Sequence, residues 1–325
     1  MQNTNKQQAS INIIGAGAIG HLFAAFLNKA KINCRLFSRK PTKTANCQLV
    51  SSEHNYYYQQ AYHSISEPLT PLAPNCTFVI CVKAPNLEAV CRQLSHIDQY
   101  QPIILLLMNG MGLVEIANQY FPSSYVLQAS TTHGAYLSES EISGAQLKQV
   151  NHTGIGQTLI GNPLKANLEI SETPYQSRLE NLITTLDRAL PDALWQANYQ
   201  PILLQKLIIN SVINPLTSLY NVNNGAIVSN KEINLLAYQL TQELAPLIDI
   251  YLAQSDWKKI FERIIEVAVA TQDNISSMRQ DINQTKATEI DYITGFLLSL
   301  AKKQDVELSL HRKLYGQIKQ LEEKF

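Results

Sequence analysis

Three glycines near the start of the chain constrain its fold more than any other feature. The run Gly15-Ala16-Gly17-Ala18-Ile19-Gly20 has the pattern G-x-G-x-x-G. It follows an apolar run at 11–14 that is typical of a strand and precedes a helical pattern over 18–30. In this setting the first glycine permits a tight turn, the second lets the backbone approach a pyrophosphate, and the third allows close packing of helix on strand. The motif predicts a dinucleotide-binding unit; a plain glycine turn is the alternative.

The rest of the first half alternates short apolar runs with helical patterns. Strands are predicted at 34–37, 78–82 and 103–107, and helices at 86–95 and 113–119. The stretch 47–64 lacks helical spacing and suits an antiparallel excursion, and 125–160 suggests strands without intervening helices. This alternation predicts an α/β fold, a Rossmann-like doubly wound sheet with antiparallel additions.

The second half of the chain changes character. Helical spacing is predicted to extend over 201–220, 231–253, 258–271, 287–301 and 309–324. A chain of 325 residues is long enough for two domains with separate cores. We therefore expect a dinucleotide-binding Rossmann-like domain over 1–197 and an all-helical substrate and catalytic domain over 198–325, with small molecules bound in a cleft between them.

The residues after the second predicted strand bear on the choice of cofactor. NAD enzymes usually place an acidic residue there to bind the ribose hydroxyls. Here the chain reads Phe37-Ser38-Arg39-Lys40, with no acid nearby. The planar guanidinium of Arg39 can bind a 2′-phosphate, and Lys40 can add positive charge. The pattern favours NADP; a solvated basic turn is the alternative.

Polar residues interrupt the apolar helix predicted at 201–220. Lys206, Asn210 and Asn214 recur every fourth residue and so line one side of that helix. Burying an ammonium and two amides without partners would cost several kcal/mol, so they either bind something polar, face solvent or satisfy other core groups. A pKa near 10.4 would keep Lys206 protonated and able to act as a general acid. Pro215 is expected to kink or end the helix around Asn214.

Three further sites are candidates with open alternatives. Lys83 and Asn109-Gly110 follow predicted parallel strands, at the edge where this architecture places ligands; a surface lysine and an ordinary turn are the alternatives. Glu289 is either a carboxylate at a helix start or a cofactor ligand. His133 is interpreted as structural.

Composition excludes other classes of protein. The 26 basic and 26 acidic residues balance, so no overall field would attract nucleic acid, and no nucleic-acid partner is expected. The longest clean apolar run, 103–108, is too short to cross a bilayer, and residues 1–10 lack the apolar core of a secretory signal. Five cysteines without a C-x-x-C pair read as reduced thiols, and the seven histidines show no metal-ligand pattern. We expect a cytoplasmic enzyme without a metal or membrane partner.

Taken together, these motifs resemble the ketopantoate reductase (2-dehydropantoate 2-reductase) family over about residues 11–310. The resemblance rests on order and spacing as well as on the motifs themselves. The segments that match the family are the glycine motif, Val82-Lys83-Ala84, Asn109-Gly110-Met111-Gly112, Thr131-Thr132-His133, 206–217, Ser276-Ser277-Met278 and 288–292.

The resemblance implies a role for each matching position. Lys206 matches the family's proton donor. Residues expected to hold the substrate's carboxylate and hydroxyl are Asn210, Asn214, Asn224 and Ser277, with Asn109 beside them. Expected cofactor contacts are Gly15, Ala16, Gly17, Ala18, Ile19, Gly20, Arg39, Lys83, Asn109, Ala135 and Glu289. Lys83 and Asn109 are also implied to take part in closing the cleft.

The resulting hypothesis is reduction of 2-dehydropantoate to pantoate by NADPH, in pantothenate and coenzyme A biosynthesis, by a monomer or homodimer. One alternative is an NADP-dependent reductase of another small 2-keto acid or a 3-hydroxy acid dehydrogenase. Another is a non-catalytic NADP-binding sensor, although a sensor has no need of the proton donor Lys206.

Overall fold

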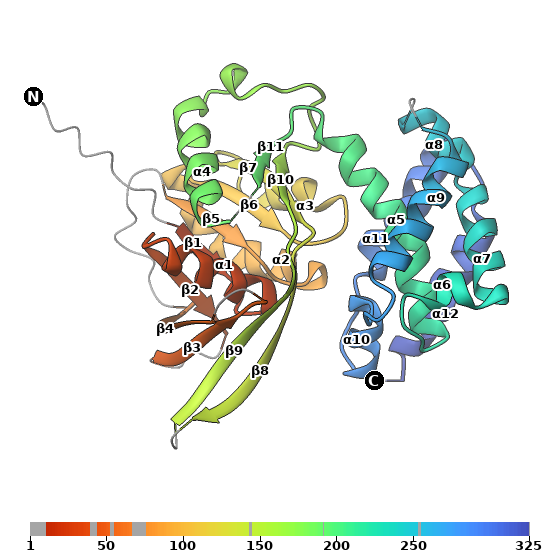
Figure 1. Cartoon of the computed structure of the whole chain (residues 1–325). Helices are drawn as coiled ribbons and strands as arrows, with labels where there is room; N and C mark the ends of the chain where they lie inside the picture. The colour runs from red at the N-terminus through yellow and green to blue at the C-terminus, as the bar shows by residue number, and fades with distance from the viewer. Residues whose placement is uncertain are drawn as a thin grey trace, which may run out of the picture. The chain divides into compact units, whose positions relative to one another are not determined.

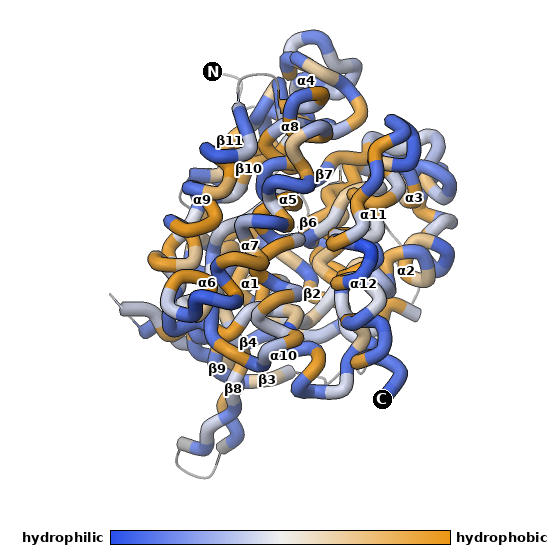
Figure 2. The backbone as a smooth tube through the Cα atoms, turned by 90° about the vertical axis from the view of Figure 1, so that its right-hand side faces the viewer, coloured by the Kyte–Doolittle hydropathy of each residue, from blue (hydrophilic) through white to orange (hydrophobic). Residues whose placement is uncertain are grey.

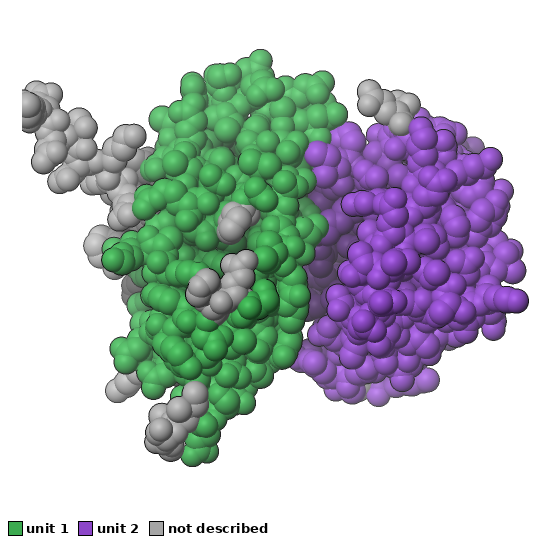
Figure 3. All heavy atoms as spheres, viewed as in Figure 1, with its two compact units in different colours: residues 1–82, 86–108, 113–200 green, residues 83–85, 109–112, 201–325 purple. Residues whose placement is uncertain are grey.

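Two compact units make up the chain in the computed structural model. The sheet unit comprises Met1–Val82, Asn86–Met108 and Leu113–Gln200. The helical unit comprises Pro201–Phe325 together with two short loops, Lys83–Pro85 and Asn109–Gly112 (Figure 3). The structure describes residues 11–39, 44–52, 55–66, 76–142, 145–190, 192–252 and 255–324. Lys40 and residues 1–10, which entered the sequence-based predictions, lie outside these ranges.

The described strands of the sheet unit form one sheet (Figure 1). Along the chain they are β1 Ile11–Ile14, β2 Cys34–Ser38, β3 Thr44–Val50, β4 Asn55–Ser64, β5 Thr77–Ile80, β6 Ile103–Leu107, β7 Tyr125–Thr131, β8 Gly134–Ile142, β9 Ala145–Gly154, β10 Thr158–Gly161 and β11 Ala193–Trp195. Their order across the sheet is β11-β10-β7-β6-β5-β1-β2-β4-β3-β9-β8.

The pairing confirms the predicted fold class. Strands β7, β6, β5, β1 and β2 are parallel neighbours, and β4 continues the parallel series beside β2. Antiparallel pairs are β3 with β4, β8 with β9, and β10 with β7. The antiparallel excursion predicted for 47–64 is the hairpin β3–β4, and the strands predicted within 125–160 are β7 to β10.

Apolar side chains bury both faces of the parallel strands. Ile11, Ile13 and Val79 pack in one core cluster with helices α1 (Ala18–Lys29) and α4 (Gln176–Ala189). The alternate residues Phe78 and Ile80 are also fully buried and point to the other face. Helix α3 (Leu113–Tyr120) packs on β7 and against α2 (Leu87–Leu94). Sequence reasoning missed α4, although its buried leucines follow helical spacing.

The helical unit contains the remaining helices. These are α5 Tyr199–Leu219, α6 Ala226–Ser229, α7 Lys231–Glu243, α8 Ala245–Tyr251, α9 Trp257–Ala270, α10 Ser277–Asn283, α11 Ile290–Lys303 and α12 Ser309–Glu322. The helical spacing predicted over 231–253 is divided between two helices, because α7 ends at Glu243 and Pro246 lies in the first turn of α8. Residue 253 lies outside the described residues. Figure 2 shows hydrophobic and hydrophilic positions alternating along α9, whose buried residues Ile260, Ile264 and Ala268 are spaced by four.

Helix α5 continues through Pro215 to Leu219. Of the two predicted effects of the proline, a kink or an end of the helix, the structure excludes the end. The hydroxyls of Thr217 and Ser218 donate to the carbonyls of Ile213 and Asn214, at 2.8 and 2.7 Å, and support the turn around the proline. By its length and composition, helix α5 could cross a membrane. This differs from the prediction that no segment of the chain could do so. However, 67% of the apolar stretch of α5 is buried inside the protein, as in the core helix of a globular protein. The helix is therefore weak evidence for a membrane-spanning segment.

Candidate active site

The glycine loop of the sheet unit has the geometry that its sequence predicts. Gly15 has φ +117°, and a Cβ there would lie 2.6 Å from the carbonyl oxygen of Cys81. A Cβ on Gly20 would collide with the carbonyl oxygen of Gly15. Gly17, in contrast, has an ordinary extended conformation, and apart from its chain neighbours no described residue has an atom within 4 Å of the place of a Cβ. The fold itself therefore requires glycine at 15 and 20, whereas at 17 it leaves open space.

The start of helix α1 suits an anion. Its first turn carries no acidic residue, and the N-cap, Gly17, supplies no side-chain hydrogen bond. The backbone N–H groups of that turn are thus not capped by a side chain, and the positive end of the helix dipole lies there. These features fit the pyrophosphate of a dinucleotide.

A buried histidine supports this loop, and sequence reasoning missed it. His21 Nδ1 lies 2.9 Å from the carbonyl oxygen of Gly17, and its Nε2 lies 2.8 Å from the hydroxyl of Tyr62 on β4. Because a carbonyl can only accept, Nδ1 carries the proton and Nε2 accepts from Tyr62. Burial lowers the pKa of His21 to about 4, so the ring stays neutral. The imidazole thus connects the glycine loop to strand β4.

Arg39 follows strand β2, close along the chain to the residue that contacts the glycine loop. The N–H of Gly15 donates to the carbonyl of Phe37 at 3.0 Å, which joins the glycine loop to the end of β2. Arg39 follows two residues later and is exposed. Ala135, the other predicted contact in the sheet unit, lies half-buried on β8.

In the helical unit, α5 carries the predicted catalytic face. Lys206 and Asn210 are half-buried, and Asn214 is buried. Burial lowers the pKa of Lys206 to about 8, while the carboxylate of Glu289 acts in the opposite direction. The pKa of Lys206 thus lies below the reference value for a solvated lysine. The amine remains mostly protonated at neutral pH but releases its proton far more readily than a solvated lysine does.

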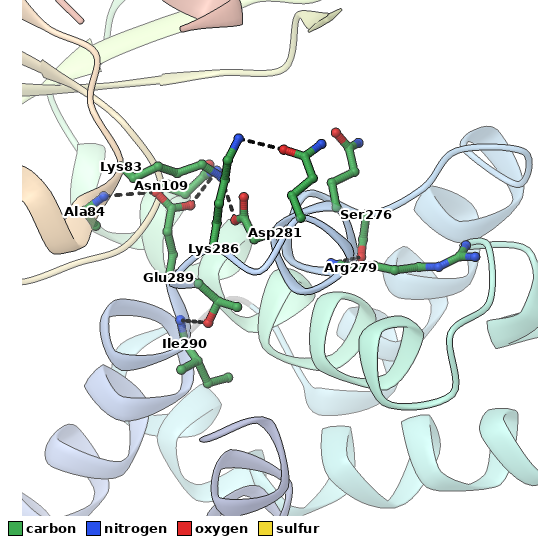
Figure 4. A network of polar contacts seen from close by, with 12 residues as sticks. Lys83, Ala84, Asn109, Ser276, Arg279, Asp281, Lys286, Glu289 and Ile290 are labelled. Atoms are coloured by element: carbon green, nitrogen blue, oxygen red, sulfur yellow. Dashed lines mark hydrogen bonds and ion pairs between the residues drawn. The ribbon is translucent and has the colours of Figure 1, made fainter. Parts of the chain in front are cut away.

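Glu289 is neither capping its helix nor exposed. It is 5% exposed at the start of α11 and makes no cap hydrogen bond there. Instead one carboxylate oxygen accepts from the backbone N–H of Ala84 at 3.2 Å, and the other accepts from the Asn109 amide at 3.3 Å (Figure 4). Burial raises its pKa, opposed by the positive charge of Lys83. One carboxylate thus holds both short loops of the helical unit.

A second contact fixes the first of these loops. Lys83 Nζ lies 2.7 Å from a carboxylate oxygen of Asp281 on α10 (Figure 4). The Lys83 side chain is 42% exposed, whereas that of Asp281 is 8% exposed. The second loop packs on α11, since the N–H of Met111 donates to the carbonyl of Tyr292 at 3.1 Å. Sequence analysis gave Asp281 no role.

The remaining predicted substrate residues lie on two segments that bind each other. The hydroxyls of Thr217 on α5 and Ser276 before α10 are 2.8 Å apart. Arg279 donates to the side-chain oxygens of Asn221 and Asn223, at 2.8 and 2.6 Å. These contacts place the loop that carries Asn224 against the segment that begins α10 with Ser277.

The structure thus brings the predicted residues together in two groups. Within the helical unit, Glu289 contacts Asn109 and acts electrostatically on Lys206, and Lys83 binds beside it. Within the sheet unit, the glycine loop and Arg39 lie at the carboxyl ends of the neighbouring strands β1 and β2. Among the described residues no group of three or more histidines, cysteines or acids could hold a metal ion.

Comparison with known proteins identifies the family. The family model described as ketopantoate reductase PanE/ApbA matches residues 11–165, and that for its C terminal matches residues 198–322. The chain belongs to the ketopantoate reductase family. The resemblance inferred from the motifs is therefore confirmed, and with it the class of enzyme, an NAD(P)-dependent oxidoreductase.

Individual relatives agree with this family. The 2-dehydropantoate 2-reductase of Vibrio cholerae is 31% identical over 315 residues, covering 97% of this chain and 98% of that protein. The crystal structure of a probable 2-dehydropantoate 2-reductase from Bacillus subtilis is 25% identical with a TM-score of 0.73, over 96% of this chain and 99% of that one. A D-mandelate dehydrogenase bound to NADH and anilino(oxo)acetate has a TM-score of 0.79 over 97% and 99% of the two chains. At 19% identity, that likeness shows the fold alone.

Proposed function

We propose that the protein reduces 2-dehydropantoate to pantoate with NADPH, in the cytoplasm, as a step of pantothenate and coenzyme A biosynthesis. The sheet unit serves as the cofactor-binding domain and the helical unit as the substrate and catalytic domain. The family membership supports the reaction. The observation that carries the assignment to this chain is Lys206, an amine on a mostly apolar helix. Burial lowers its pKa to about 8, and the buried carboxylate of Glu289 partly opposes this shift.

Lys206 acts as the general acid in this proposal. Bound NADPH supplies a hydride to the carbonyl carbon. The ammonium of Lys206 stabilises the negative charge that develops on the carbonyl oxygen and then transfers its proton to that oxygen, giving the alcohol. A lysine whose pKa lies near the working pH suits this role, because it is protonated yet transfers its proton easily. Asn210 and Asn214, on the same side of α5, orient the substrate.

The residues of the sheet unit fit NADP as the cofactor. The glycine loop leaves room at Gly17 for a pyrophosphate, and the first turn of α1 offers uncapped N–H groups. Arg39, exposed after β2, is placed for a 2′-phosphate, which a guanidinium binds through two parallel hydrogen bonds. Ala16, Ala18, Ile19 and Ala135 complete the proposed cofactor contacts in this unit.

The test is oxidation of NADPH by the purified protein with different keto acids. We expect the highest kcat/KM with 2-dehydropantoate and much lower values with pyruvate and 2-oxoisovalerate. Reduction of another keto acid in preference to 2-dehydropantoate would contradict the substrate assignment. Binding of NADPH without oxidation in the presence of any of the three would favour the non-catalytic sensor.

A further inference from the structure

The carbonyl oxygen of Gly17, in the glycine loop, accepts two hydrogen bonds from the same residue. The backbone N–H of His21 donates to it at 3.0 Å, which is the bond that begins helix α1. The imidazole Nδ1–H of His21 donates to it as well, at 2.9 Å. The helix needs only the first of these bonds. The second uses the remaining lone pair of the carbonyl and holds this one peptide group in place.

The peptide group that His21 holds also carries a donor for the cofactor. A trans peptide is planar, so the C=O of Gly17 and the N–H of Ala18 point in opposite directions along α1. This N–H is one of the four at a helix start that have no acceptor within the helix. Gly17 is extended, with φ −81° and ψ −176°, and glycine restrains its own backbone less than any other residue. A bond that fixes the Gly17 carbonyl therefore also fixes the direction of the Ala18 N–H.

His21 is itself fixed on the other side of its ring. The residue is fully buried, and the Tyr62 hydroxyl donates to Nε2 at 2.8 Å. The Tyr62 oxygen lies 3.9 Å from Cys47 Sγ, and the Lys148 ammonium lies over the Tyr62 ring, 5.3 Å from its centroid. Because Nε2 accepts, the proton of the neutral ring stays on Nδ1, whereas the other tautomer would present a lone pair to the Gly17 carbonyl. His21 thus acts through the direction of one N–H and not through a charge.

We propose that His21 is a positioning residue for the cofactor, which directs the Ala18 N–H at the pyrophosphate by holding the Gly17 peptide. The inference rests on the proposed function only in taking NADPH as the cofactor, and it is independent of the keto acid. The N-cap residue Gly17 supplies no side-chain hydrogen bond, so the direction of the first N–H groups of α1 depends on the backbone alone. A carbonyl that accepts a second bond also polarises its peptide, which strengthens the N–H as a donor.

The experiment compares two substitutions of equal shape at this position in the full-length protein. Asparagine and leucine have side chains of the same size and branching, and both lose the bond to Tyr62. His21→Asn keeps a donor, because the amide nitrogen can take the place of the imidazole Nδ1 opposite the Gly17 carbonyl. His21→Leu has no donor there. The difference between the two variants therefore isolates the bond to Gly17.

Two ligands distinguish the pyrophosphate from the rest of the cofactor. NADPH contains the pyrophosphate, whereas adenosine 2′-monophosphate has the adenine and the 2′-phosphate without it. We expect the Kd of NADPH, measured by fluorescence titration, to be about three- to tenfold higher in His21→Leu than in His21→Asn, the effect of one hydrogen bond. The Kd of adenosine 2′-monophosphate, measured by calorimetry, should be the same in both. The KM for NADPH should follow its Kd, while kcat at saturating NADPH stays unchanged.

A buried histidine of the helical unit provides the matched control. His311 is fully buried, and its Nδ1 lies 2.7 Å from a carboxylate oxygen of Glu243. His311→Leu should lower the melting temperature without changing the Kd of NADPH. If His21→Leu does not fold, Tyr62→Phe tests the same bond, because it removes the partner that fixes the His21 tautomer. We expect Tyr62→Phe to raise the Kd of NADPH about two- to threefold and to leave that of adenosine 2′-monophosphate unchanged.

Each outcome decides. Weaker binding of NADPH in His21→Leu, restored in His21→Asn and without a change for adenosine 2′-monophosphate, supports the inference. Equal NADPH affinity in the two variants would overturn it, as would a parallel loss for both ligands. A loss of NADPH affinity in His311→Leu as large as that in His21→Leu would assign the effect to reduced stability and also overturn it. These results leave the proposed function intact, whereas absence of NADPH binding to the wild-type protein would overturn both.

Discussion

The ammonium of Lys83 lies 2.7 Å from the carboxylate of Asp281, although 198 residues separate them in the chain. The two partners differ in exposure, 42% for the Lys83 side chain and 8% for Asp281. Replacing one partner should therefore change stability by a different amount from replacing the other. An unpaired Lys83 can be solvated by water where it lies, whereas an unpaired Asp281 stays buried.

The first prediction concerns this asymmetry. Lys83→Met should lower the free energy of unfolding by about 1–3 kcal/mol, because it leaves a buried carboxylate unpaired. Asp281→Asn should cost less than about 1 kcal/mol, since the amide oxygen still accepts from the half-exposed lysine. Urea denaturation of the two variants measures the difference.

An exposed ion pair serves as the control. Arg263 and Glu266 pair at 2.6 Å on α9, with side chains 58% and 62% exposed. Arg263→Met should change stability by no more than about 0.5 kcal/mol. A larger loss in Asp281→Asn than in Lys83→Met would show that burial of the carboxylate does not govern this contact.

Alanine substitutions in the glycine loop should distinguish a glycine required for folding from one required for cofactor binding. Gly17→Ala should leave the melting temperature nearly unchanged, because nothing lies within 4 Å of the added Cβ, yet it should weaken NADPH binding at least tenfold by blocking the approach of the pyrophosphate. Gly20→Ala should destabilise the protein, because its Cβ meets the carbonyl oxygen of Gly15. Thermal unfolding and NADPH fluorescence titration test both. Wild-type affinity for NADPH in Gly17→Ala would contradict the proposed position of the phosphates.

Arg39 should determine the preference for NADPH over NADH. Arg39→Glu replaces a phosphate-binding cation with a repelling anion, and we expect KM for NADPH to rise about ten- to hundred-fold while KM for NADH changes little. Arg188→Glu on α4, an exposed arginine of the same unit, controls for the change in net charge. If the KM values for both cofactors rise equally in Arg39→Glu, the 2′-phosphate assignment is wrong.

Replacing the proposed proton donor should separate chemistry from binding. Lys206→Ala should lower kcat by about 10²–10⁴-fold, the usual contribution of general acid catalysis, while the dissociation constant of NADPH stays near the wild-type value. Single-turnover kinetics and fluorescence titration measure the two quantities. Near-normal turnover in this variant would remove Lys206 from the reaction.

The pH dependence of the reaction should report the pKa of Lys206. Because the protonated amine is the acid, kcat/KM should be constant below pH 8 and fall tenfold per pH unit above it, as the amine loses its proton. The Glu289 charge raises this pKa, so Glu289→Gln should move the break to lower pH. A break that stays in place in Glu289→Gln would mean that the carboxylate does not act on Lys206.

The sequence by itself determined those structural features of this protein that depend on residues close together along the chain. A strand, a glycine turn and a helix are contiguous, so the motif at Gly15–Gly20 predicted its own geometry, and the alternation of apolar runs predicted the α/β sheet. Local patterns left other details open. The helical spacing over 231–253 did not reveal the break between α7 and α8. The proline at 215 could have kinked or ended α5, and the helix continues through it, where hydroxyls of the next turn support the backbone.

Only the tertiary structure decided how distant residues act together. Glu289 could be read as a helix-start carboxylate, yet its partners Ala84 and Asn109 lie 205 and 180 residues away. The pKa of Lys206 depends on burial by the fold, and the Asn224 amide donates at 3.0 Å to the hydroxyl of Thr271, 47 residues further along the chain. Electrostatic and hydrogen-bond energies depend on distance in space and on exclusion of water, and neither quantity is encoded in spacing along the sequence.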